Sequence, residues 1–367
     1  MPGVAVERFD ERGAAPRLDV APELLKEYGE FVLGGGGDAG GQGLEDGAEG
    51  GFGQEVAGGV GGPGFRPGGV GAGRPRLLAG NGPPGAEFVV VDLRLPRALD
   101  GLLVGFAMGM AGAVFQSLSR NPLGSPDIIG FGSGASAGAL VAIIVLDAGA
   151  PQTALDAVCG GFATAAAVYL LAWKRGVHGY RLVLVGIGVS AVIGSVTSYL
   201  YVRAEIGKAA QAATWMIGSL NGRGWSDVRI AAVGLVLLVP VVLAHVRRLT
   251  LLEMGDDSAS ALGIHPERTR LTLLAAGTGL TAMAVAASGP IPFVALAAPQ
   301  LARRITRFPG PNVLPAAWLG AALVATADWA TQRISGSAIL PVGVVTGVVG
   351  GIHLAWLLLR ERRSGRL

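Results

Sequence analysis

Long apolar segments alternate with short polar loops over most of this chain. Each apolar segment holds about 20 residues and almost no charge, which is enough to cross a hydrocarbon layer of ~30 Å as a helix. A shorter apolar piece at residues 209–220 is typical of a helix that is only partly inserted. The pattern predicts an all-α, polytopic membrane bundle with visible spans at residues 99–118, 128–146, 153–173, 182–201, 228–246, 268–288, 291–306, 313–330 and 339–359.

The first 75 residues break this pattern. They are rich in glycine, carry scattered charges and prolines, and contain no apolar stretch long enough for a helix. Such a composition cannot bury enough surface to offset the entropy of ordering, so we expect a disordered segment or one translated from a misassigned start. We therefore divide the chain into a low-complexity segment, 1–75, and a membrane domain, 76–367.

Small residues recur at a spacing of four in the first two apolar segments. They form one face in each, with Gly105, Gly109 and Ala113 in the first segment and Gly130, Gly134 and Gly138 in the second. Small residues at this spacing let helices approach closely in a bilayer, where lipid provides no hydrophobic force between them. The two segments are therefore expected to pack tightly on each other, joined by a rigid corner at residues 119–126.

Composition supports a membrane protein and excludes several other classes. Of the 367 residues, 51% are hydrophobic and 15% are charged, whereas soluble chains carry about 25% charged residues. The sequence has no GxxxxGK[ST] phosphate loop, metal-ligand spacing or catalytic constellation, so we expect neither an enzyme nor a chain that binds a cofactor itself. The net charge of +3 is small, and no nucleic-acid partner is expected.

Lysine and arginine gather in alternate loops, which indicates the orientation of the chain. The richer loops, around residues 174–181, 247–248 and 303–307, should face the cytoplasm together with the C-terminus. Arg94 then lies outside. Nine spans would leave the polar N-terminal segment outside as well, so we expect a tenth, missing span before Arg94.

Residues 94–135 hold an ordered set of motifs. The set begins with Arg94-Leu95-Pro96-Arg97 and continues with a small-residue segment ending in Gln116, then Arg120-Asn121-Pro122-Leu123-Gly124-x-Pro126, then Gly130-x-x-x-Gly134-Ala135. It resembles the permease subunits of the ABC importers for iron-siderophores, haem and vitamin B12, the FecCD type.

Three later stretches extend the resemblance. Residues 251–264 resemble the family's cytoplasmic coupling segment. In residues 288–304, Gln300 follows Pro299 where family members usually carry histidine. Residues 327–350 resemble the last two helices, with Ile339 in place of the usual glutamate before Pro341.

The resemblance implies a fold, a function and a set of partners. The fold is the type II ABC importer permease, with ten spans in the intact family. The function is that of a translocation subunit in the cytoplasmic membrane of a bacterium, driven by a separate ATPase that binds ATP and Mg²⁺. The other partners are a second permease, either a homologue or a copy of this chain, and an extracytoplasmic substrate-binding protein. Ferric siderophore is the expected cargo, closest to the catecholate type, with vitamin B12 or haem as alternatives.

The resemblance also assigns roles to individual residues. Arg94, Arg97 and Arg333 are expected to dock the binding protein, although an outer arginine is more commonly an interfacial anchor. Asp328 would orient Arg333 or cap the helix end. Segments 99–118, 182–201 and 291–306 would line the pore. The ATPase coupling residues are expected to be Leu252, Gly255, Asp256, Ala259, Leu262 and Gly263, and the packing and gating residues Gly105, Gly109, Gln116, Asn121, Pro122, Gly130, Gly134, Pro299, Gln300, Pro341, Gly343 and Gly347.

The residues alone leave two other functions to consider. A secondary transporter or channel without ATPases would need ionisable residues at mid-membrane for ion coupling, and the apolar segments hold nearly none. A purely structural membrane scaffold is the other alternative.

Overall fold

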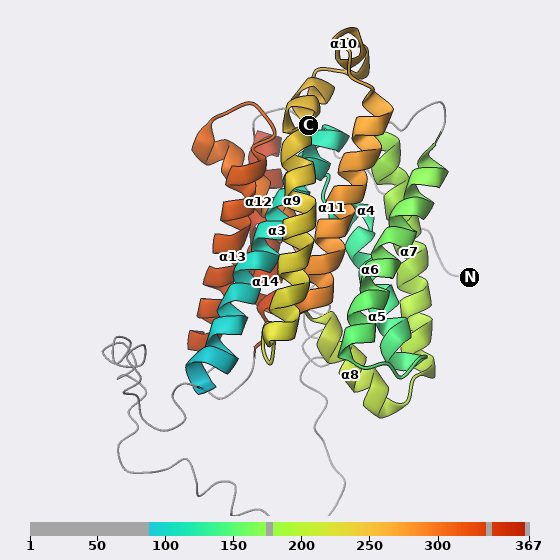
Figure 1. Ribbon diagram of the computed structural model, residues 1–367, viewed down its shortest axis with the longest axis vertical. Coiled ribbons are helices and arrows are strands. Elements are labelled where there is room, and N and C mark those ends of the chain that lie inside the picture. The colour runs from blue at the N-terminus through green and yellow to red at the C-terminus, as the bar shows by residue number, and fades with distance from the viewer. Residues whose placement is uncertain (1–87, 174–178, 335–339, 364–367) are drawn as a thin grey trace, which may run out of the picture. The chain divides into compact units, whose positions relative to one another are not determined.

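The computed structural model describes residues 88–173, 179–334 and 340–363, all of which lie in the compact unit Gly71–Leu367. Regular structure in these residues is entirely helical, as the apolar pattern predicts (Figure 1). The predicted segment 1–75 and the expected missing span lie outside the described residues. The elements are, in chain order, the π-helical η2 (Phe88–Arg94) and the helices α3 (Leu95–Ser119), α4 (Pro126–Ile129), α5 (Phe131–Ile144), α6 (Ala150–Ala172), α7 (Gly179–Arg203), α8 (Ile206–Met216), α9 (Trp225–Glu253), α10 (Asp256–Ala261), α11 (Pro266–Ser288), α12 (Val294–Thr306), α13 (Val313–Ile334) and α14 (Val342–Arg363).

Helix α3 is largely buried and forms the centre of the packing. It packs along α13 and also contacts α9, α11 and α12. A Cβ atom added at Gly105 would come within 2.8 Å of the Cα of Ala321, and one at Gly109 within 2.9 Å of the carbonyl carbon of Ala316. These glycines bring the two backbones into direct contact, which is how membrane helices gain packing energy. The predicted glycine face of this segment is therefore a packing face, directed at α13.

The second predicted glycine face packs against α6. A Cβ at Gly134 would lie 2.8 Å from the carbonyl oxygen of Gly160, and one at Gly138 would lie 2.9 Å from the carbonyl carbon of Asp156. Within the described residues, α3 makes no extensive contact with α5. The expectation that the first two segments pack on each other is wrong, because each glycine face fits a different partner helix with small residues of its own.

Six helices in the described part of the chain are long and apolar enough to cross a membrane: α3 with η2, α6, α7, α9, α11 and α13. Two of the nine predicted spans are shorter than expected. The 128–146 span is divided at Gly130, whose φ of +94° ends α4 and begins α5. The 291–306 span shortens to the 13 residues of α12. The predicted span 339–359 corresponds to α14, which holds 22 residues. The piece predicted as partly inserted forms the 11-residue α8, which is too short to span a bilayer.

Replacing Gly109 by valine should separate α3 from α13, because the added Cβ would overlap the Ala316 carbonyl group. Overpacking of a tight contact costs about 1–3 kcal/mol, so we expect a lower unfolding temperature for the detergent-solubilised protein. The matched control is Gly194→Val in α7, where nothing lies within 4 Å of an added Cβ. Equal losses of stability in the two variants would contradict this account of the packing.

Candidate functional site

Helix α10 projects beyond the other helices at one end of the bundle (Figure 1). Gly255, with φ +122°, and Gly263, with φ +79°, bracket it, and side chains other than glycine rarely adopt such angles. Leu252 and Ala259 are buried against the bundle, whereas Leu262 is 60% exposed. The predicted coupling segment is thus a short, firmly seated helix with an apolar outer side chain.

Asp256, the first residue of α10, is held by two arginines from other parts of the fold. Arg120 donates from Nη2 to Asp256 Oδ1 (2.8 Å) and from Nε and Nη2 to the carbonyl oxygen of Leu252 (3.1 and 2.6 Å). Arg270 of α11 donates from Nη2 to both carboxylate oxygens (3.0 and 3.1 Å). Sequence analysis named Asp256 but missed both arginines as its partners. They lie 136 and 14 positions away along the chain, and contacts at such separations leave no periodic signal.

Two buried glutamines attach the end of α3 and the turn after it to α12. Gln116 Nε2 donates to the carbonyl oxygen of Leu296, and Gln300 Nε2 donates to that of Pro122, both at 3.0 Å. Removing the partner of a buried polar group costs about 1–3 kcal/mol, so both contacts hold the turn in place. Gln300 stands where the resembled family usually has histidine, and its amide makes this contact without any change of protonation.

The turn between α3 and α4 is shaped by its own side chains. Asn121 Oδ1 accepts a hydrogen bond from the N–H of Leu123, and the N–H of Gly124 donates to the carbonyl oxygen of Asn121, both at 2.9 Å. A Cβ at Gly130 would lie 3.2 Å from the Ser190 Cβ of α7. The predicted rigid corner is therefore present, and it is packed against α7.

Helix α12 is short because of the residues at its start and in its middle. Phe293 precedes it with a left-handed φ of +68°, and its N–H donates to the buried carboxylate of Asp127. Pro299 lies inside the helix and lacks the N–H that would continue the hydrogen-bond ladder. The prolines at positions 290, 292 and 299 predict a short, broken helix for this motif. Helix α12 is short, but it continues through Pro299 without a break.

Helix α14 begins directly after Pro341. The N–H of Gly343 donates to the carbonyl oxygen of Gly218 (3.0 Å), and a Cβ at Gly343 would overlap the Ile217 carbonyl group. At Gly347 the nearest atom to an added Cβ would be 3.8 Å away, which is an ordinary contact. Of the two glycines predicted to pack closely here, Gly343 does so and Gly347 does not.

At the opposite end of α3, Arg97 is engaged within the bundle. Its Nη2 and Nε donate to Asp328 Oδ1 of α13 (2.7 and 3.1 Å), and its Nη1 donates to Asn221 Oδ1 (3.0 Å). Asp328 therefore pairs with Arg97, and the expectation that it would orient Arg333 is wrong. Arg333 instead lies over the Trp329 ring, 5.3 Å from its centroid, and both Arg94 and Arg333 are exposed.

Asp100 is a buried carboxylate that sequence analysis did not single out. It lies in α3, close to Arg97 along the chain, and neither carboxylate oxygen has a hydrogen-bond partner in the described residues. Arg223 and Asp227 are its charged neighbours. Asp100 thus lies in a group of ionisable residues near the Arg97 end of the bundle.

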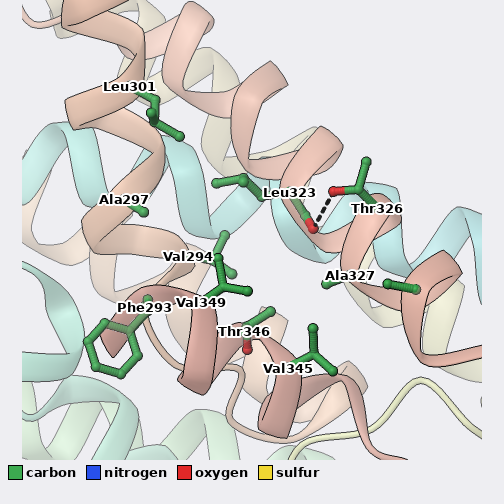
Figure 2. Close-up of a pocket in the computed structure, with 12 residues that line it drawn as sticks. Phe293, Val294, Ala297, Leu301, Leu323, Thr326, Ala327, Val345, Thr346 and Val349 are labelled. Carbon is green, nitrogen blue, oxygen red and sulfur yellow. Dashed lines mark hydrogen bonds between the residues drawn. The ribbon is translucent and has the colours of Figure 1, made fainter. Parts of the chain in front are cut away.

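An apolar pocket of about 240 Å³ lies between α12, α13 and α14. Figure 2 shows Phe293 and Val294 on one side of it and Thr326 and Ala327 on the other. The hydroxyl groups of Thr326 and Thr346 donate to carbonyl groups of their own helices. The pocket offers no charged group to a ligand, so it is best described as a packing gap beside α14.

Replacing Asp328 by alanine should destabilise the fold more than replacing Arg333 by glutamine. The first change removes the carboxylate partner of the Arg97 guanidinium, which is only 21% exposed. The free energy of unfolding should fall by a value on the order of 3 kcal/mol. The unfolding temperature in detergent measures both variants. A double variant, Arg97→Met with Asp328→Leu, should recover most of the loss, and equal effects of Asp328→Ala and Arg333→Gln would refute a structural role for the pair.

Comparison with known proteins assigns the fold and the class. The pattern of the FecCD transport family matches residues 75–360. The ferric enterobactin transport system permease FepG of Escherichia coli (strain K12) is 45% identical over 276 residues, covering 75% of this chain and 84% of that protein. The Fe(3+) dicitrate permease FecD of the same strain is 37% identical over 278 residues, covering 75% and 86%.

A solved structure supports the same conclusion. An inward-facing ABC transporter of the metal-chelate type aligns with a TM-score of 0.70 and 28% identity, over 76% of this chain and 89% of that one. Because the family pattern covers well over half of the chain and both relatives exceed 30% identity, this multi-pass membrane permease belongs to the FecCD transport family.

Proposed function

We propose that this permease is the translocation subunit of an ATP-driven importer for ferric siderophores in the cytoplasmic membrane of a bacterium. A separate ATPase binds and hydrolyses ATP with Mg²⁺, a second permease completes the pathway, and an extracytoplasmic binding protein delivers the cargo. The similarity to the ferric enterobactin and ferric dicitrate permeases supports the cargo class.

The observation that carries the proposal is the form of α10. A part that receives movement from another subunit must be stiff and must protrude, and α10 does both. Leu252 and Ala259 anchor it in the bundle, while Met254 and Leu262 keep 68% and 60% of their surfaces exposed. Exposed apolar side chains that flank a helix at the end of a polytopic bundle suit a cleft in a soluble subunit. We therefore assign Met254 and Leu262 to contact with the ATPase, and the buried coupling residues to support.

The opposite end supports docking of a soluble partner. Arg94 and Arg333 are exposed, and a guanidinium offers a planar, permanently charged fork that fits carboxylates. Arg97 is committed to Asp328 and Asn221, so we leave it out of the docking surface. Acidic residues on a binding protein would then meet Arg94 and Arg333.

Helix α7 supports a second permease and a pathway on one side of the bundle. Most of α7 is exposed, and nothing lies within 4 Å of a Cβ added at Gly188 or Gly194. Ser195 and Ser198 lie on the same helix and bond only to their own backbone. Such a small, hydroxyl-bearing surface suits a bulky chelate moving past it. Helix α3, which the resemblance implied would line the pore, is buried within this chain and is left out of the pathway.

Deleting the gene should prevent growth on ferric siderophore as the only iron source, and a plasmid copy should restore growth. The permease purified from the complemented strain should bring an ATPase with it. Growth on a ferrous salt is the control for general fitness. Loss of haem or vitamin B12 uptake in place of siderophore uptake would reassign the cargo, and uptake in the absence of any ATPase would refute the proposed mechanism.

The double variant Arg94→Glu/Arg333→Glu should reduce siderophore uptake to background, because both docking charges are reversed. The amount of protein in the membrane should stay normal, since both side chains are exposed. The matched control, Arg94→Lys/Arg333→Lys, keeps the charge and should retain most of the uptake. Uptake that is unchanged in the glutamate variant would remove both residues from the docking surface.

A further inference from the structure

Asp256 connects three separate parts of the fold at the α10 end. It begins α10, it accepts from Arg270 of α11, and it accepts from Arg120, the residue that follows α3. Arg270 is almost fully buried, with 6% of its side chain exposed, while Arg120 and Asp256 keep 44% and 39% exposed. The Arg270 contact therefore seats α10 in the bundle, and the Arg120 contact lies nearer to the surface.

Arg120 is positioned by its backbone as well as by its side chain. Its φ of +50° lies in the left-handed region, and its N–H closes α3 on the Ser117 carbonyl oxygen at 3.2 Å. From this point the guanidinium reaches the last turn of α9, where two of its nitrogens share the carbonyl oxygen of Leu252. One side chain therefore holds both the end of α9 and the beginning of α10, with hydrogen bonds strengthened by its charge.

The residues on both sides of Arg120 lie directly against α7 and α12. A Cβ at Gly179 would come within 2.8 Å of the Ser119 Cα, and one at Gly186 within 2.9 Å of the Ile129 Cα. Gln300 of α12 holds the carbonyl oxygen of Pro122 at 3.0 Å. With so little free space, a displacement of this turn must be shared by α7 and α12.

We propose that Arg120 is a positioning residue that transmits movement of α10 to α7 and α12. The inference rests on the proposed function, because the movement is supplied by the ATPase. An exposed ion pair contributes little to stability, typically less than about 1 kcal/mol. Loss of the Arg120 contacts should therefore uncouple transport from ATP hydrolysis while the fold and the bound ATPase remain intact.

The test uses the permease purified together with its partner subunits and reconstituted in lipid vesicles. The variants are Arg120→Asn, in which asparagine tolerates the left-handed backbone, and Asp256→Asn. The matched control is Asp257→Asn, the neighbouring exposed residue of α10, which makes no hydrogen bond or ion pair in the described residues. The measurement is the amount of siderophore taken up per ATP hydrolysed, together with the amount of ATPase bound.

In Arg120→Asn and Asp256→Asn, uptake per ATP should fall by about fivefold or more, the lower end of the usual coupling between distant sites. In Arg120→Asn, ATPase binding and the unfolding temperature should stay at wild-type values, because that ion pair is exposed. Asp256→Asn should also lower the unfolding temperature, because it takes the carboxylate away from the buried Arg270. The Asp257→Asn control should match the wild type in every measurement. Leu262→Asp, which alters the exposed face of α10, should instead release the ATPase.

Three results would overturn the inference. They are an unchanged ratio of uptake to ATP in Arg120→Asn, a proportional loss of both activities, and release of the ATPase by this variant. Failure of the proposed function would be seen separately, because the wild-type complex itself would then show no ATP-dependent uptake.

Discussion

Direct backbone contact between α3 and α13 is the constraint on which the rest of the structure depends. In a bilayer, apolar side chains gain nothing by leaving lipid for a neighbouring helix, so close approach and dispersion must supply the packing energy. Gly105 and Gly109 provide that approach. With α3 fixed in this way, α9, α11 and α12 can pack around it, and both of its ends are placed where they meet other parts of the fold.

The second constraint is that irregular backbone inside the membrane must be buried and bonded within the protein. The segment after α3 meets this requirement through side chains. Gln116 and Gln300 hold carbonyl groups across the boundary with α12, and Asp127 accepts from the N–H of Phe293. These bonds turn a break in the helical pattern into a defined contact of α3 and the following turn with α12. The buried amides of Gln116 and Gln300 thus specify where the short helix α12 lies.

The two ends of the bundle differ in a way that fits directional transport. One end carries a short helix seated by buried residues and by two arginines, with apolar side chains directed outward. The other end carries exposed arginines above an internal ion pair between α3 and α13. A rigid bundle between two such ends can pass a displacement from one to the other as a movement of whole helices. The chain itself needs no catalytic group for this role.

The sequence by itself determined the class of the protein and much of its local structure. The length of the apolar segments predicted a helical membrane bundle. The prolines around residue 299 predicted a short helix, and Gly255 and Gly263 lie at the two ends of α10. Each of these features is set by residues that are close together in the sequence, so the sequence alone can predict it. The sequence also singled out Arg94 and Arg333, because the charges of the loops and the positions of the motifs place both arginines at the outer face.

Only the tertiary structure decided which surfaces meet. A stripe of small residues shows that a helix can pack closely, but it does not name the partner, and the first two stripes pack against α13 and α6 instead of each other. The partner of Asp328 proved to be Arg97, 231 positions away, and Asp256 is shared by Arg120 and Arg270. Such pairs are set by how the helices pack in three dimensions, and no spacing along the chain records them.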